Sequence, residues 1–502
     1  NSGSLKAIVT LISRIITAVI GIIFVPIYVR IIGVESYGLV AFYGTLAGSL
    51  AILDLGLSTA INRQVAILKA HTNKEKEIKD LIFSVELIYW SIGLLVGLLI
   101  VVLAHPIAIY WVKAKDLPTI VIERAVMLMG AVFAFQFPTS IYNGVMIGME
   151  RQVPNAVLTI LFTVARAAGV ILILKLVQPT VEYYFLWQVL LTFLFTISLR
   201  IYVRQKLTIR NTKARFSVPQ LKSIWRFAAG MAGISVVTFF LSQVDKIVVS
   251  KLVLLEFVGY YSLAFLIANV LQQVISPLQV VVFPRFASLL AQNKQSELLE
   301  LYHRSCRWVA IIVFPIGLVL IFFAKEILMF WTKNPELVKN TAPLVQVCTA
   351  GTVCNCMMWI PYSYLLAKGN TRFTIYQNII ASVILVPLLF WWTGKYGAIG
   401  ACFVWLSINI GYVLISLPLF YHRYLKGEMG RWYKKDVALP LITAMILTVG
   451  AKYFQVRMIP DIKIIYFIIL LLFISSIYFF IIPELRAFSS KLKFGRRSRA
   501  GL

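Results

Sequence analysis

The chain has 502 residues, of which 60% are hydrophobic and only 14% are charged. A soluble protein of this size does not need so much apolar surface, so the composition indicates a membrane protein with many spans. A formal net charge of +28 is compatible with a nucleic-acid partner. In a membrane protein, however, it first reflects basic cytoplasmic loops. We therefore expect no nucleic acid among its partners.

The cysteines do not predict a disulfide framework or a metal site. All five lie in or beside apolar runs, and their number is odd. The spacing Cys354-Asn355-Cys356 inside a helical run does not suit a zinc site. We also expect no cleavable signal peptide, because the first apolar run is too long and leads directly into a second.

Two apolar runs open the chain, at 5–32 and 39–61. Each exceeds the roughly 20 residues that cross a bilayer, yet they carry Arg14, Asp54 and Arg63. A charge at membrane depth costs about 2.5–3.5 kcal/mol, so it normally faces a bundle interior or a wet cavity. Snorkelling to the headgroups is the alternative for Arg14. Its depth of about 14 Å and the Thr17 side chain on the same helical face favour the cavity.

About fourteen apolar runs of spanning length follow one another along the chain. Most Lys and Arg residues fall in alternate loops, which predicts that both termini are cytoplasmic. The later runs lie near residues 81–104, 119–147, 154–177, 182–203, 224–250, 257–283, 305–331, 341–366, 374–393, 398–421, 437–455 and 463–483.

A weak internal repeat predicts the domain organisation. The segment 35–39 resembles 256–260, and a basic residue, Arg63 or Arg285, ends the helix after each copy. The sequence therefore predicts an all-α polytopic membrane protein of two six-helix lobes with two extra C-terminal helices. Its expected parts are an N-terminal lobe 1–203, a basic cytoplasmic linker 204–223, a C-terminal lobe 224–424, two added helices 425–484 and a basic cytoplasmic tail 485–502.

Several predicted helices carry polar stripes on one face. Such stripes can simply form hydrogen bonds between helices, each worth about 0.6 kcal/mol. Their number instead favours a polar internal volume. The main stripe residues are Asn155, Thr163 and Arg166 in 154–177, Gln272 and Gln273 in 257–283, and Asn355, Trp359 and Tyr362 in 341–366.

The charge of this volume indicates its ligand. Asp54 cannot pair with Arg63 on its own helix, and it shares a face with Ser58 instead. The cations therefore remain partly free, and guanidinium groups suit phosphate. Asp245 and Lys246 either pair with each other or serve a separate role. The full set of charges predicted within helices is Arg14, Arg63, Arg166 and Lys246 against Asp54, Glu86 and Asp245.

A sequence pattern in the first two runs identifies a family. It reads Pro26…Gly33-x-x-x-Tyr37-Gly38, then Leu53-Asp54-Leu55-Gly56-Leu57 and Arg63, and Asp245 with Gly259-Tyr260 resembles its second copy. This pattern resembles the polysaccharide-export branch of the multidrug/oligosaccharidyl-lipid/polysaccharide (MOP) exporter superfamily, and most closely the O-antigen (Wzx-type) flippases. The resemblance implies a MATE-like fold in a bacterial inner membrane.

The resemblance also implies alternating-access transport of undecaprenyl-diphosphate-linked oligosaccharide to the periplasmic leaflet. The diphosphate would bind Arg14, Arg166 and Arg63. The sugar would contact cavity residues, and Asp54, Asp245 and Lys246 would serve H⁺ or Na⁺ coupling. No cofactor is expected, and polysaccharide polymerase machinery is an expected partner beside membrane lipids. The expected cavity residues are Thr17, Asn155, Thr163, Gln272, Gln273, Asn355, Trp359 and Tyr362.

Three alternatives are less consistent with the residues. A drug or cation antiporter of the same superfamily should have an acidic cavity, whereas the predicted one is basic. A glycan polymerase or transferase would need a convergent acid, base or nucleophile, usually with a sizeable external loop. A lipid II flippase would carry a cavity arginine on the eighth helix, where this stripe is neutral and Arg285 lies only at the end. ATP is not expected as the energy source, because the sequence lacks a phosphate-binding loop motif.

Overall fold

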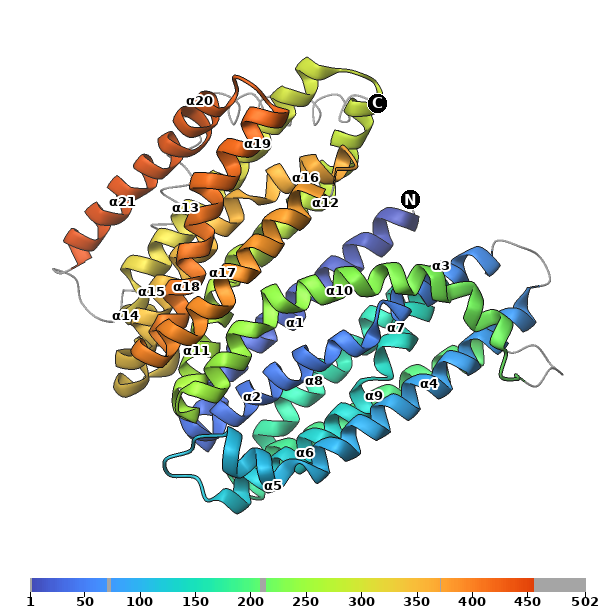
Figure 1. Ribbon diagram of the computed structural model, residues 1–502. Coiled ribbons are helices and arrows are strands. Elements are labelled where there is room, and N and C mark those ends of the chain that lie inside the picture. Colours follow the sequence, from blue (N-terminus) through green and yellow to red (C-terminus); the bar gives the residue numbers. More distant parts are fainter. Residues whose placement is uncertain (1, 70–73, 208–213, 371, 456–502) are drawn as a thin grey trace, which may run out of the picture. The chain divides into compact units, whose positions relative to one another are not determined.

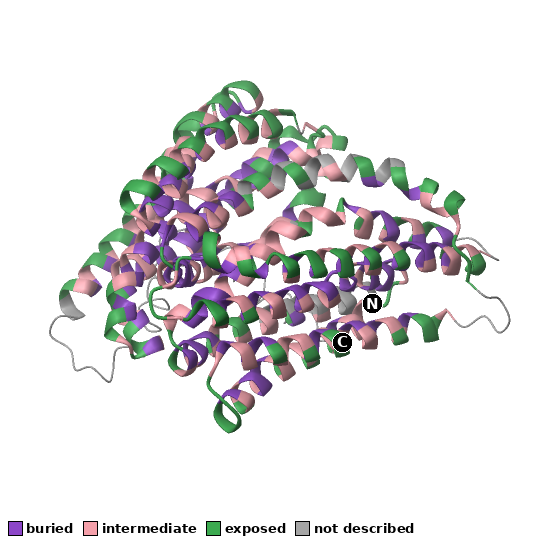
Figure 2. Cartoon of the chain, turned by 60° about the horizontal axis from the view of Figure 1, so that its bottom comes forward, coloured by how far each residue is buried: buried purple, intermediate pink, exposed green. Residues whose placement is uncertain are grey.

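The computed structural model describes residues 2–69, 74–207, 214–370 and 372–455, and within these ranges the secondary structure is helical without strands. The predicted all-α fold is thereby confirmed. The chain divides into two compact units, residues 1–262 and 263–502, which are described separately. Buried and exposed residues alternate along most helices (Figure 2), so each of these helices has a packed face and an exposed face.

Eleven stretches in the described ranges are long and apolar enough to cross a membrane. Two further predicted runs, 5–32 and 224–250, fall on the helices α1 and α10. The last predicted run, 463–483, lies outside the described residues. Every predicted run up to residue 455 therefore coincides with a helix, and the total of fourteen stays a prediction.

In the N-terminal unit, long helices pack side by side. Helix α6 packs against α4 and α9, and α8 packs against α1 and α9 (Figure 1). The bounds are α1 (Ser2–Ile32), α2 (Val34–Leu50), α3 (Leu57–Lys69), α4 (Glu75–Val102), α5 (Ala104–Pro106), a π-helical turn (Ile107–Trp111), α6 (Thr119–Gln136), α7 (Thr139–Gly148), α8 (Gln152–Leu176), α9 (Val181–Lys206), α10 (Val218–Leu252) and α11 (Leu255–Ala268), whose end passes into the second unit.

The C-terminal unit repeats part of this packing. Helix α15 packs against α13 and α18, and α17 packs against α18. The bounds are α12 (Val270–Ala291), α13 (Gln295–Phe322), α14 (Ala324–Thr332), α15 (Pro335–Met357), α16 (Trp359–Ala367), α17 (Arg372–Tyr396), α18 (Ala398–Gly411), the π-helix η3 (Tyr412–Ser416), α19 (Leu417–Tyr424), α20 (Met429–Arg431), the π-helix η4 (Trp432–Ala438) and α21 (Leu439–Gln455).

The unit boundary after Ser262 differs from the predicted boundary of the repeat. Helix α10, the first helix of the predicted C-terminal lobe, packs against α2, α3 and α4 and belongs to the N-terminal unit. Compactness and internal repetition are different properties of a chain. The predicted lobes 1–203 and 224–424 therefore stay a prediction about the repeat.

Several runs that were expected as continuous helices are interrupted. The run 119–147 breaks before α7 at Pro138, and 341–366 breaks before α16, three residues ahead of Pro361. Proline lacks an N–H group and its ring clashes with the carbonyl four residues earlier. The run 39–61 breaks after the 3₁₀ turn Ala51–Asp54, where Leu55 and Gly56 adopt φ of 46° and 71°.

A further interruption lies in the run 257–283, at the turn between α11 and α12. Breaks thus occur in the second and fourth spans of the first half, and again in the eighth and tenth spans. The same spans are interrupted in both copies of the predicted repeat, which supports its existence.

The two copies of the repeated segment, residues 35–39 and 256–260, lie in close contact. A Cβ on Gly38 would lie 2.2 Å from the carbonyl oxygen of Leu255, and one on Gly259 would lie 3.2 Å from that of Val34. The backbones of α2 and α11 therefore approach so closely that only glycine fits at position 38. This explains the glycine in the pattern Tyr37-Gly38.

We predict that Gly38→Ala lowers the stability of the protein. The added methyl group would clash with backbone, which cannot rotate away, and such overpacking costs about 1–3 kcal/mol or more. The measurement is the thermal unfolding midpoint of purified protein in detergent. Gly44→Ala on the same helix is the matched control, because no atom lies within 4 Å of its Cβ position. Equal midpoints for both variants would contradict the close approach of α2 and α11.

Candidate functional site

Arg166 lies inside the span formed by α8 and has no acidic partner in the described part of the chain. Its Nε atom is buried without a hydrogen-bond partner. The guanidinium carbon lies 5.6 Å from the centre of the Phe195 ring on α9. The guanidinium group thus lies over an aromatic ring, and its hydrogen-bonding capacity is not consumed by a carboxylate.

Further unsatisfied polar atoms lie on α1 and α8, which pack together. The Oγ1 atom of Thr17 and the Oδ1 atom of Asn155 are both buried without a partner. From Asn155 to Arg166, α8 rises about 16 Å. Thr163 lies between them and is half-buried. Because buried polar atoms are normally hydrogen-bonded, this helix pair retains capacity for a polar ligand or water.

Arg14 and Arg63 are the other two residues that were predicted to bind phosphate, and the structure describes only Arg63 in full. Arg14 lies in α1, but its side chain is outside the described part of the structure, so its role stays a prediction. Arg63 is exposed on α3, a helix that packs against α4, α7 and α10. Nothing described brings Arg63 to the α1–α8 pair.

Two hydroxyl groups donate hydrogen bonds to the carboxylate of Asp54. Ser58 Oγ donates to its Oδ2 atom at 2.8 Å, and Tyr89 of α4 donates to its Oδ1 atom at 2.6 Å. The break after residue 54 places this carboxylate at the end of a 3₁₀ turn. Its oxygens therefore have fixed positions but no cation among these partners.

Asp245 and Lys246 do not form an ion pair in the described structure. Tyr261 donates to Oδ2 of Asp245 at 2.7 Å, and Oδ1 is buried without a partner. Lys246 Nζ instead donates to the carbonyl oxygen of Ser242 at 3.0 Å. Lys246 therefore does not contact the carboxylate directly, and one carboxylate oxygen keeps its hydrogen-bonding capacity.

Glu86 holds three helices together rather than facing a ligand. Its side chain is only 6% exposed, and it contacts Arg200 and Arg204 of α9, the latter at 3.1 Å. Tyr142 of α7 donates to it at 2.8 Å. This cluster therefore satisfies one of the three acids that were predicted within helices.

We predict that Glu86→Ala destabilises the protein by about 1–3 kcal/mol, because it removes the acceptor that Tyr142 and two half-exposed arginines share at a buried position. The thermal midpoint and the yield of folded protein in detergent measure this effect. Glu75→Ala, at an exposed position at the start of the same helix, should change neither quantity. If both variants melt alike, the ion cluster does not hold α4 and α9 together.

The C-terminal unit contains a polar pocket of about 320 Å³. Three predicted sugar contacts, Asn355, Trp359 and Tyr362, line it together. They come from α15 and α16, on either side of the break at Met358. Gln377 and Asn378 of α17 add two further amides to the wall. Amides beside aromatic rings suit a ligand rich in hydroxyl groups.

Of the two glutamines of α12 that were predicted to contact sugar, only Gln272 contacts a pocket residue. Gln272 Nε2 donates to Asn355 Oδ1 at 3.2 Å, so it orients a pocket residue from behind. Asn355 Nδ2 in turn donates to Asn409 Oδ1 at 2.7 Å. Gln273 is exposed and does not line the pocket. Fixed hydrogen bonds thus set the orientation of the Asn355 amide.

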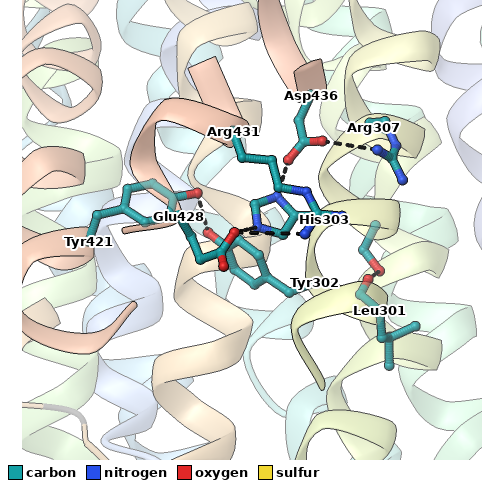
Figure 3. Close-up of polar contacts among 9 residues, drawn as sticks. Leu301, Tyr302, His303, Arg307, Tyr421, Glu428, Arg431 and Asp436 are labelled. Atoms are coloured by element: carbon teal, nitrogen blue, oxygen red, sulfur yellow. Dashed lines mark hydrogen bonds and ion pairs between the residues drawn. The ribbon is translucent and has the colours of Figure 1, made fainter. Parts of the chain in front are cut away.

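Sequence reasoning missed a buried charge network that joins α13 to η4 (Figure 3). The His303 Nδ1 atom contacts Asp436, and its Nε2 atom lies 2.9 Å from Glu428. Arg307 lies 3.5 Å from Asp436, and Arg431 lies 3.8 Å from Glu428. Both ring nitrogens face carboxylates, a geometry that the imidazolium form satisfies. The partners are more than 120 residues apart, so no local pattern could have predicted the network.

The chain matches the model of the polysaccharide biosynthesis protein family over residues 5–290, more than half its length. The chain belongs to this family. The MatE family model matches residues 231–391 of this family member. A relative from Shigella flexneri, described as "Putative O-antigen transporter", is 20% identical over 397 residues, which cover 78% of this chain and 91% of the relative. The predicted resemblance to the polysaccharide-export branch is thereby confirmed.

Solved structures confirm the fold of this family member. It superposes on a lipid II flippase, MurJ in an inward closed conformation, with a TM-score of 0.68 and 15% identity, covering 95% of this chain and 98% of that one. A multidrug resistance MATE family transporter of the MOP superfamily in an inward-facing conformation gives a TM-score of 0.62 at 14% identity, covering 83% and 97%. The chain is therefore a multi-pass membrane protein with the MATE-like fold.

Proposed function

We propose that this protein is a flippase that moves an undecaprenyl-diphosphate-linked oligosaccharide, such as an O-antigen repeat unit, from the cytoplasmic to the periplasmic leaflet of a bacterial inner membrane. The proposal places both termini in the cytoplasm. It includes polysaccharide polymerase machinery as a partner. The names of the relatives, an O-antigen transporter and a lipid II flippase, agree with this class of cargo.

Arg166 is the observation that carries the proposal. A guanidinium group inside a span costs several kcal/mol unless something compensates for its charge, and its described neighbours are aromatic rings rather than carboxylates. A diphosphate supplies the missing negative charge and accepts bidentate hydrogen bonds. In this mechanism Arg166, together with Arg14, replaces the water that the diphosphate loses on entering the protein, and Arg63 on α3 would contact the diphosphate at a separate step.

The polar pocket of the C-terminal unit suits the glycan. Asn355, Trp359 and Tyr362 present an amide and two aromatic rings to its interior. Sugars combine hydroxyl groups with apolar C–H faces, so they fit such a mixed lining. Gln272 would act through Asn355, and Thr17, Asn155 and Thr163 would line the polar path in the other unit.

A proton or sodium gradient would drive transport. Asp245 has one buried oxygen without a partner, and Asp54 has both oxygens hydrogen-bonded by hydroxyl groups. Asp245 is therefore the better candidate for binding the coupling ion, with Lys246 beside it, and Asp54 is the second candidate. In liposomes, Asp245→Asn should remove the dependence of flipping on the imposed gradient.

We predict that Arg166→Ala reduces flipping at least tenfold, since a hydrogen bond to a charged group is worth about 1.5–3 kcal/mol. Arg166→Lys should retain part of the activity because it keeps the charge but loses the bidentate geometry. The measurement is flipping of the lipid-linked glycan in proteoliposomes, with complementation of a flippase-null strain. Arg124→Ala, at an exposed position on α6, is the control. If an Arg14→Ala, Arg166→Ala double variant still complements the strain, the diphosphate assignment is wrong.

A further inference from the structure

Helix α17 is the least buried of the candidate spans. Only 17% of its apolar window is buried, and it packs mainly against α18. Its counterpart in the first half, α8, has α1 on one side and α9 on the other. Large apolar residues of α17, among them Ile380 and Ile384, are exposed. This helix therefore presents an apolar face beside α18 that the described part of its own unit leaves uncovered.

A groove of about 740 Å³ follows this face, between α17 and the segment formed by α18, η3 and α19. Its lining residues on α17 run from Arg372 to Leu388, a rise of about 24 Å. The hydrocarbon core of a bilayer is about 30 Å thick. The groove therefore extends through most of the depth of the apolar layer.

The shape of α18 deepens the groove. Its last residue, Gly411, lines the groove, and no atom lies within 4 Å of the position that its Cβ would occupy. The π-helix Tyr412–Ser416 follows directly. Such π-helical turns are often found at functional sites. A missing side chain at the start of an irregular turn thus leaves room for an elongated apolar ligand.

One end of the groove is cationic. Arg372 and Arg423 both line it, both are exposed, and neither forms an ion pair with a residue in the described ranges. Between them, Asn370 Nδ2 donates to the Tyr424 hydroxyl group at 2.9 Å, and Arg423 lies over the Tyr424 ring. The sequence places this end at the cytoplasmic surface. Two guanidinium groups at the mouth of an apolar groove complement a lipid phosphate.

The groove also adjoins the polar pocket. Phe373, Gln377 and Tyr412 line both spaces, so one wall of side chains separates them. A ligand that used the groove, the arginines and the pocket would need an apolar chain, a phosphate group and a hydroxyl-rich headgroup. A glycerophospholipid would occupy the groove and leave the amide pocket unused.

We propose that this groove is a loading site for the lipid-linked glycan, in which the polyprenyl chain lies along α17 and the diphosphate binds Arg372 and Arg423. The first sugars then point past Gln377 toward Asn355 and Trp359. This inference rests on the proposed function for its choice of lipid. The site is separate from Arg166, and it lies wholly within the C-terminal unit.

The test measures lipid binding to the purified full chain by native mass spectrometry. The probes are undecaprenyl diphosphate, undecaprenol and phosphatidylglycerol, each titrated at equal concentration. We expect undecaprenyl diphosphate to bind at least tenfold more tightly than the other two, because only it combines the long chain with two phosphates. Equal binding of phosphatidylglycerol would overturn the assignment and make the groove a phospholipid site.

Two variants locate the binding. Gly411→Leu should fill the groove and weaken binding of undecaprenyl diphosphate at least tenfold. Its control is Gly394→Leu on α17, which also has open space at its Cβ position but lies outside the groove.

The double variant Arg372→Ala, Arg423→Ala should weaken binding similarly, whereas Arg304→Ala, at an exposed position in the same unit, should not. Unchanged binding in both groove variants would overturn the proposal.

The same measurements separate this proposal from the proposed function. Arg166→Ala should abolish flipping and leave undecaprenyl diphosphate bound to the groove. If Arg166→Ala flips normally while the groove variants lose binding, the transport mechanism through Arg166 is wrong and the loading site stands. If Arg166→Ala abolishes flipping while the groove variants bind and flip like the wild type, the loading site is wrong and the proposed function stands.

Discussion

The cost of placing a charge in apolar surroundings governs this structure. Two buried carboxylates are compensated by nearby cationic groups: Glu86 contacts two arginines, and Asp436 contacts His303 and lies near Arg307. These contacts fix α4 to α9 and α13 to η4, so they act as structural anchors. Arg166 differs because its described contacts are aromatic. The proposed diphosphate would supply the negative charge that these contacts lack.

Interrupted helices bring the other polar groups into position. The break at Met358 separates α15 from α16, so Asn355 and Trp359 line one pocket from two helices. The break after Asp54 places its carboxylate where Tyr89 can reach it. Irregular backbone is tolerated inside a membrane where protein or water satisfies it, and discontinuous helices are a common way to build transporter sites. The repetition of these breaks in both halves indicates that they belong to the architecture.

The two units offer complementary chemistry. In the N-terminal unit, Arg166 and the unsatisfied atoms of Thr17 and Asn155 suit an anion and its water. In the C-terminal unit, amides and aromatic rings suit a sugar, and the groove beside α17 suits a long apolar chain. A lipid-linked glycan contains all three parts. Membership in the polysaccharide biosynthesis protein family is consistent with such a ligand.

The sequence alone determined the all-helical membrane fold, because the length of each apolar run reports directly on crossing a bilayer. Contacts between distant segments were decided only by tertiary structure. His303 meets Asp436 across 133 residues, Glu86 meets Arg200 across 114, and the groove beside α17 requires two helices to lie side by side. Helical periodicity specifies on which face of its helix a residue lies. Only the packing of the helices specifies which neighbouring helix that face contacts.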